Sequence, residues 1–168
     1  MDAEAVMTPK KKDLKALFEP QSIAVVGASR RPESVGYAIM KNLVSGGFKG
    51  KIFPVNPKAE EILGVKCFSS AADLPENVDL AIFIIPGVAV PAALEACAKK
   101  GAKAAIVISA GFREIGEKGL KLEQEVKRIA DRYGIAILGP NCLGLINSDP
   151  LFSMNATFSG HIPGAGNI

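Results

Sequence analysis

Short apolar runs alternate with amphipathic segments along this chain, and no other feature constrains its fold as strongly. The runs occupy residues 23–26, 52–55, 80–85, 104–108 and 135–138. Each run is apolar at successive positions rather than at every second one, which is typical of strands in a parallel sheet that helices cover on both faces. The sequence therefore predicts five buried, parallel strands.

The segments between these runs have the spacing of helices. Apolar side chains at Val35, Ile39 and Leu43 recur every fourth residue, so they share one face of a helix. Similar stripes predict helices at residues 91–101 and 122–133 and a short leading helix at 10–17, whereas residues 62–68 fit a short helix or an edge strand. This order predicts an α/β fold, a doubly wound, mostly parallel sheet of Rossmann-like type.

Composition limits the domain organisation and the classes of partner. The chain has 168 residues, 48% of them apolar and 22% charged, which suits one globular domain. We expect an N-terminal segment with a short helix at residues 1–18, a Rossmann-like domain at 19–150, and an arm or linker at 151–168 that leads into a further domain. The net charge of +3 is too small to predict a nucleic-acid-binding surface.

The cysteines and the short apolar runs indicate the compartment. Three widely spaced cysteines accompany a single histidine, so no metal site is predicted. Reduced thiols are typical of the cytoplasm. The apolar runs are too short to span a membrane, and we therefore expect a cytoplasmic protein with no membrane partner.

Small and polar residues follow every predicted strand, at the edge where open α/β sheets bind their ligands. The first such segment, residues 27–36, opens a helix that Ser34 can cap, and Gly36 leaves room for a phosphate. This segment departs from the GxGxxG fingerprint of dinucleotide-binding loops. A tight turn that needs small residues for packing is the alternative interpretation.

The segment after the second strand indicates which nucleotide fits. NAD-binding domains usually carry an acidic residue there to hold the ribose hydroxyls, whereas this chain has Asn56 and then Lys58. A lysine at this place favours a phosphorylated ribose by charge pairing. NADP and coenzyme A (CoA) both have such a ribose, and an ordinary surface lysine is the alternative.

The chain shows no catalytic constellation. Cys142, beside Asn141, could lie near a reactive end of a ligand, although a partly buried cysteine is more often inert. His161 has no identifiable partner, and Glu33 and Glu114 are expected to face water.

Four segments at predicted strand ends carry a family resemblance. They are SIAVVGAS at residues 22–29, VNPK at 55–58, ISAGF at 108–112 and GPNCLG at 139–144. Together they resemble the CoA-binding domain of ADP-forming acyl-CoA synthetases. That family includes the ADP-forming acetate–CoA ligases and is related to the succinyl-CoA synthetase alpha subunit. The resemblance extends over residues 14–168.

The resemblance implies a CoA site along this edge of the sheet. The loop at residues 27–36 would hold the CoA diphosphate, and Lys58 would meet the adenosine phosphate end. Residues 85–86 and 108–110 would flank the adenine or the pantetheine, with the thiol toward residues 141–142. The binding residues implied in this way are Gly27, Ala28, Ser29, Arg30, Ser34, Val35, Gly36, Asn56, Pro57, Lys58, Ile85, Pro86, Ile108, Ser109, Ala110, Asn141 and Cys142.

The resemblance also implies a reaction and partners. Members of the family convert acyl-CoA, ADP and phosphate reversibly into acid, CoA and ATP, through an acyl phosphate and a phosphorylated histidine. That histidine belongs to the following domain, and His161 does not match its motif. ATP, ADP and Mg²⁺ bind an ATP-grasp domain or subunit. We therefore expect CoA or acyl-CoA as ligand, these two domains as partners, and no catalysis by this chain alone. A CoA-sensing domain, free-standing or fused to a protein acetyltransferase, and an NADP-dependent oxidoreductase domain are the alternatives.

Overall fold

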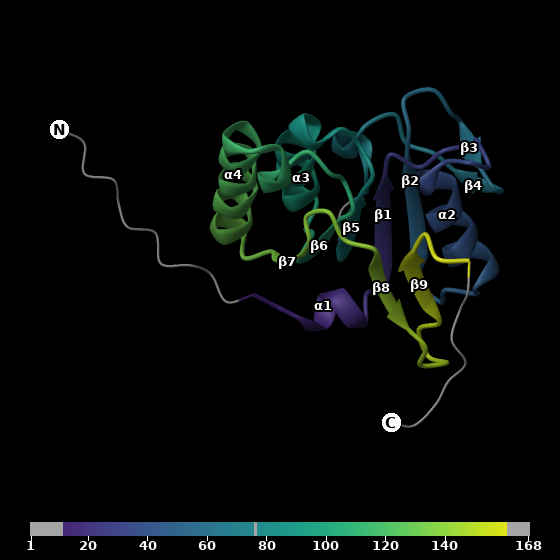
Figure 1. The fold of residues 1–168 in the computed structure, drawn as a ribbon. Helices are drawn as coiled ribbons and strands as arrows, with labels where there is room; N and C mark the ends of the chain where they lie inside the picture. Colours follow the sequence, from purple (N-terminus) through teal and green to yellow (C-terminus); the bar gives the residue numbers. More distant parts are fainter. Residues whose placement is uncertain (1–11, 76, 161–168) are drawn as a thin grey trace.

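A five-stranded parallel sheet forms the centre of the molecule (Figure 1). The computed structural model describes residues 12–75 and 77–160. The strand order is β2-β1-β5-β6-β7, and every neighbouring pair is parallel. The predicted doubly wound α/β fold is therefore confirmed. The strands are β1 Ser22–Val26, β2 Lys51–Val55, β5 Leu80–Phe83, β6 Ala104–Val107 and β7 Ala136–Leu138.

Helices cover both faces of the sheet because the strands are apolar on both faces. Ile23 and Val25 of β1 pack in one apolar layer with α2 (Val35–Ser45) and α1 (Lys15–Phe18). Ala24 and Val26 pack in the opposite layer with α3 (Val90–Lys99) and α4 (Glu117–Tyr133). Figure 1 shows α3 and α4 on one side of the sheet and α2 on the other. Among the described residues, none of the helices has the length and apolar character needed to cross a bilayer.

Two helices differ from the sequence expectation at their starts. α4 begins at Glu117, five residues before the predicted start. The prediction began too late because the first turn of the helix lacks the apolar stripe that marks the rest. An ion pair between Glu117 Oε1 and Lys121 Nζ, 2.8 Å apart, joins that turn to the next. α1 is confined to Lys15–Phe18, and residues 10 and 11 of the predicted leading helix lie outside the described residues.

The ambiguous segment at residues 62–68 contains part of a small antiparallel hairpin, β3 (Glu61–Ile62) and β4 (Val65–Lys66). Phe68 then forms a parallel bridge to Val55 at the end of β2. Of the two alternatives, the structure has the strand. The hairpin follows directly from the segment that contains Lys58, and three 3₁₀ turns, at Ala71–Asp73, Gly87–Ala89 and Arg113–Ile115, complete the loops at this edge.

Within the expected arm at residues 151–168, four residues form a strand that was not predicted. β9 (Met154–Thr157) pairs antiparallel with β8 (Gly144–Asn147), and Met154 and Ala156 are buried in the α2 layer. The four residues of β9, Met-Asn-Ala-Thr, alternate apolar and polar side chains, so they lack the continuous apolar run by which the other strands were predicted. The last part of the expected arm, residues 161–168 with His161, lies outside the described residues.

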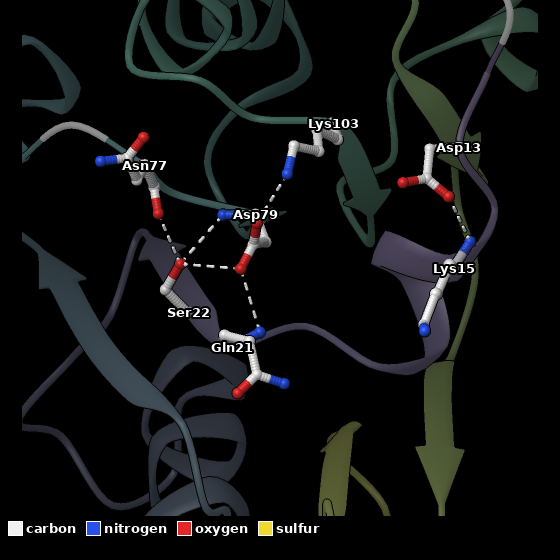
Figure 2. Close-up of polar contacts among 7 residues, drawn as sticks. All are labelled: Asp13, Lys15, Gln21, Ser22, Asn77, Asp79 and Lys103. Atoms are coloured by element: carbon white, nitrogen blue, oxygen red, sulfur yellow. Dashed lines mark hydrogen bonds and ion pairs between the residues drawn. The ribbon is translucent and has the colours of Figure 1, made fainter.

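A polar network ties β1 to β5 at the amino-terminal edge of the sheet (Figure 2). Asp79 Oδ2 accepts a hydrogen bond from the Gln21 backbone N–H at 3.0 Å and lies 3.3 Å from Ser22 Oγ. Its other oxygen lies 3.3 Å from Lys103 Nζ. The Ser22 hydroxyl also accepts from the Asp79 backbone N–H at 3.0 Å. One half-buried carboxylate, just before β5, therefore contacts donors at the start of β1 and an ammonium group just before β6, the strands on either side of β5.

Replacing Asp79 with alanine is expected to lower the free energy of unfolding by about 1–3 kcal/mol, because the Gln21 N–H and the part-buried Ser22 hydroxyl lose a charged acceptor. The exposed ion pair with Lys103 contributes little of this. Urea denaturation measures the change. Asp13→Ala is the matched control, since the Asp13 carboxylate accepts a single local bond from Lys15 N at 2.9 Å in an exposed turn (Figure 2). Equal losses in the two variants would contradict the bridging role of Asp79.

Candidate functional site

The carboxyl ends of β1, β2 and β5 surround a cavity of about 910 Å³ whose far wall is α3. This is the sheet edge at which the sequence predicts a ligand. Seven of the predicted residues line the cavity: Gly27, Ala28, Ser29, Asn56, Pro57, Lys58 and Ile85. The cavity therefore joins residues from three separate strand ends into one candidate site.

The α3 wall was not predicted from the sequence. Ala89, Ala92, Ala93 and Ala96 line the cavity, at a spacing that places them on one side of α3 and its preceding turn. The core side of α3 is formed by Leu94 and Cys97, which are fully buried. The signal in the sequence was this second stripe of small residues, which leaves room for a flat or apolar group beside the helix.

A second hollow, of about 1030 Å³, lies on the other side of the segment that contains Lys58. Pro57, Lys58 and Ser69 line both hollows. The second hollow is polar, and its charged lining residues are Arg30, Lys58, Glu60, Glu61 and Lys66. Lys58 thus stands between an alanine-rich cavity and a charged one. Ser69, like Ser70 and Ala71, was missed by the sequence analysis because it reaches the site only through the fold. Arg31, which also lines the alanine-rich cavity, lies within the predicted loop at residues 27–36.

Side-chain hydrogen bonds join the loop after β1 to the loop after β2. The Asn56 amide donates from Nδ2 to Ala28 O at 2.7 Å, and its Oδ1 accepts from Lys58 N at 2.8 Å. In the opposite direction, Arg30 Nη2 donates to Lys58 O at 3.0 Å. The two loops therefore hold each other, with the main chain of Lys58 at their junction.

The start of α2 approaches the same loop but does so through packing. Ser34 caps the helix as predicted, because its Oγ accepts from Tyr37 N at 3.2 Å. A Cβ atom at Gly36 would lie 2.2 Å from Gly27 O. Among the described residues, those that line the cavity do not include Ser34, Val35 or Gly36. A close approach of two backbone segments therefore requires a glycine at position 36.

The segment after β6 does not line the cavity but holds the end of β5 beside it. The buried hydroxyl of Ser109 donates to Phe83 O and accepts from Ile85 N, each at 3.2 Å. Ile108 is buried as well, whereas Pro86 and Ala110 are exposed at the same edge. Ser109 therefore fixes the end of β5, from which Ile85 reaches the cavity.

Asn141 lies in a separate, smaller hollow of about 440 Å³ together with Arg113, Glu114 and Glu123. The Arg113 guanidinium pairs with the Glu123 carboxylate, and hydrogen bonding from Arg113 lowers the pKa of Glu123. Glu114 accepts from the Gly111 backbone N–H, a bond that lowers the pKa of its carboxyl. The structure therefore does not bring Asn141 into the alanine-lined cavity.

Cys142 follows Asn141 and is partly buried. Its Sγ lies 3.5 Å from Val107 O, and burial raises the pKa of the thiol. A raised pKa keeps the sulfur protonated near neutral pH and makes it a poor nucleophile. The geometry thus favours the inert interpretation of this cysteine.

A comparison with known protein families identifies the family of the domain that carries this site. The profile of the family described as "CoA binding domain" matches residues 21–148, which run from just before β1 to just after β8. The chain belongs to this CoA binding domain family. The matched range contains all the residues that line the two hollows beside Lys58.

Relatives of this CoA binding domain include larger proteins. An ADP-forming acetate–CoA ligase of Methanocaldococcus jannaschii is 47% identical over 156 residues, which are 93% of this chain and 21% of the ligase. The alpha subunit of ADP-forming acetate–CoA ligase I of Pyrococcus furiosus is 46% identical, over 86% of this chain and 32% of the subunit. The chain thus spans between a fifth and a third of these relatives.

A solved structure agrees with these sequence matches. An acetyl-coenzyme A synthetase 1 of Ca. Korarchaeum cryptofilum, in complex with phosphate and ADP, superposes on this CoA binding domain with a TM-score of 0.79. The two are 46% identical, and the match covers 87% of this chain and 31% of that one. The resemblance found in the sequence is therefore confirmed at the level of family and fold.

Proposed function

We propose that this chain binds CoA or acyl-CoA as the N-terminal domain of an ADP-forming acyl-CoA synthetase. The synthetase converts acyl-CoA, ADP and phosphate reversibly into acid, CoA and ATP. One observation carries the proposal. Lys58 follows the carboxyl end of β2 and lines both the alanine-lined cavity and the charged hollow. A nucleotide with a phosphorylated ribose matches this combination of apolar and cationic surfaces.

The proposed ligand lies along the sheet edge with its parts matched to the lining. The adenosine occupies the cavity beside the alanines of α3, and its ribose phosphate pairs with Lys58. The diphosphate lies against the loop of Gly27, Ala28 and Ser29. The pantetheine then runs past Ile85 and the end of β6, toward Asn141.

The proposed partners are the domain that carries the phosphorylated histidine and an ATP-grasp domain or subunit that holds ATP or ADP with Mg²⁺. Two observations support this division. The relatives are three to five times longer than the matched segment, and burial raises the pKa of the Cys142 thiol, which makes it a poor nucleophile. We infer that this chain supplies CoA binding in the cytoplasm and that the reacting groups come from the partners.

An NADP-dependent oxidoreductase domain is the second candidate, because Lys58 would pair equally well with the 2′-phosphate of NADP. Titration calorimetry of the chain with CoA, dephospho-CoA and NADP at one salt concentration separates the candidates. We expect CoA to bind most tightly. Tighter binding of NADP would overturn the proposal, and a failure to bind all three ligands would contradict CoA binding by this chain alone.

A further inference from the structure

The loop that carries Lys58 is held at both polar atoms of the Lys58 main chain. The Asn56 side chain accepts from Lys58 N at 2.8 Å, within a turn that a 3.3 Å bond from Ala59 N to Asn56 O closes. The Arg30 guanidinium donates to Lys58 O at 3.0 Å. The first contact is local to the loop, whereas the second crosses from the loop after β1.

Fixing the main chain matters because the lysine side chain is long. Its ammonium group stands on a flexible four-carbon stem, and ordering that stem against a phosphate costs rotamer entropy. Lys58 is exposed, so packing does little to orient it. A fixed origin for the stem is therefore the main restraint on where the ammonium group can reach.

We propose that Arg30 is a positioning residue that sets the discrimination between CoA and dephospho-CoA by holding the main chain of Lys58. This inference rests on the proposed function, in which Lys58 pairs with the ribose phosphate. Arg30 lines the charged hollow beside Lys58. The Arg30 guanidinium has five N–H donors, and one of them is bonded to Lys58 O. This bond holds the guanidinium against the main chain of the loop after β2.

The competing role for Arg30 is a direct contact with the phosphate, and a double-mutant cycle distinguishes the two roles. Arg30→Met and Lys58→Met remove the polar groups while keeping most of the aliphatic stems. Calorimetry of the wild type, both single variants and the double variant gives the ratio of CoA affinity to dephospho-CoA affinity for each protein. A general loss of fold stability would weaken both ligands and leave this ratio unchanged.

We expect Arg30→Met to lower the ratio about three- to tenfold, the range for loss of one hydrogen bond. In the Lys58→Met background the same change is expected to leave the ratio where Lys58→Met alone puts it. An unchanged ratio in Arg30→Met would overturn the inference. An equal further loss in the Lys58→Met background would also overturn it, because Arg30 would then act on the phosphate directly.

The failure of the proposed function has a different signature. If the wild type binds CoA and dephospho-CoA equally, Lys58 does not read the ribose phosphate and the inference falls with that role. If the wild type discriminates and Lys58→Met abolishes the discrimination, the proposed role of Lys58 stands whatever Arg30→Met does. The two proposals are therefore tested separately by one set of proteins.

Discussion

Replacing Lys58 with glutamate is expected to weaken CoA binding by at least about tenfold while affecting dephospho-CoA much less. The ammonium–phosphate pair should contribute about 1.5–3 kcal/mol, since hydrogen bonds to charged groups are stronger than neutral ones. Glutamate removes this pair and adds a repulsion against the same phosphate. Dephospho-CoA lacks the phosphate and should keep most of its affinity. Calorimetric titration with both ligands measures the difference.

Lys49→Glu is the matched control for the change in net charge. Lys49 is exposed and follows α2, and its backbone N–H donates to Phe152 O, in the turn that joins β8 to β9. This position is at the amino-terminal edge of the sheet, opposite the cavity. The control is expected to retain the preference for CoA over dephospho-CoA. Equal losses for the two ligands in Lys58→Glu would remove Lys58 from the ribose phosphate.

The buried strands could be predicted from the sequence because a parallel sheet covered on both faces leaves an unmistakable pattern. The apolar runs at residues 23–26 and 104–108 were located to within a residue or two of β1 and β6. β9 was missed because it leaves no such apolar pattern in the sequence. Its four residues bury Met154 and Ala156 only because β8 and α2 lie beside them, and this neighbourhood exists only in the fold.

Some residues of the candidate site could likewise be predicted from local sequence, whereas others could not. Lys58 could be identified as a candidate binding residue from local sequence alone, because it follows the second predicted strand. Ser69 and Ala92 could not, because each reaches the cavity from a different element and neither carries a distinctive side chain. The contact of Arg30 with Lys58 O spans 28 positions in the chain, so a local pattern could not reveal it.

Gly36→Ala is expected to lower the free energy of unfolding by about 2 kcal/mol or more and to weaken CoA binding as well. The added Cβ would lie 2.2 Å from Gly27 O and 3.3 Å from Ser29 N, so either the helix start or the loop must shift. Overpacking of this kind costs about 1–3 kcal/mol or more. We expect an overpacking cost at the upper end of this range, because the added Cβ would lie so close to Gly27 O. The better helix propensity of alanine offsets only about 1 kcal/mol of that cost.

The loop that would shift is the one that the proposed function assigns to the CoA diphosphate, which is why a packing change should reach the ligand. Gly27 cannot yield easily, since its N–H is bonded to Val55 O at 3.0 Å and its own φ is +97°. Thermal unfolding and CoA titration of Gly36→Ala measure the two effects. Gly160→Ala is the control, because a Cβ there meets nothing within 4 Å. A Gly36→Ala protein as stable as this control would show that the contact between α2 and the loop relaxes without cost. Normal stability with weakened CoA binding would instead mean that Gly36 lies against the ligand itself, as the phosphate interpretation of the sequence required.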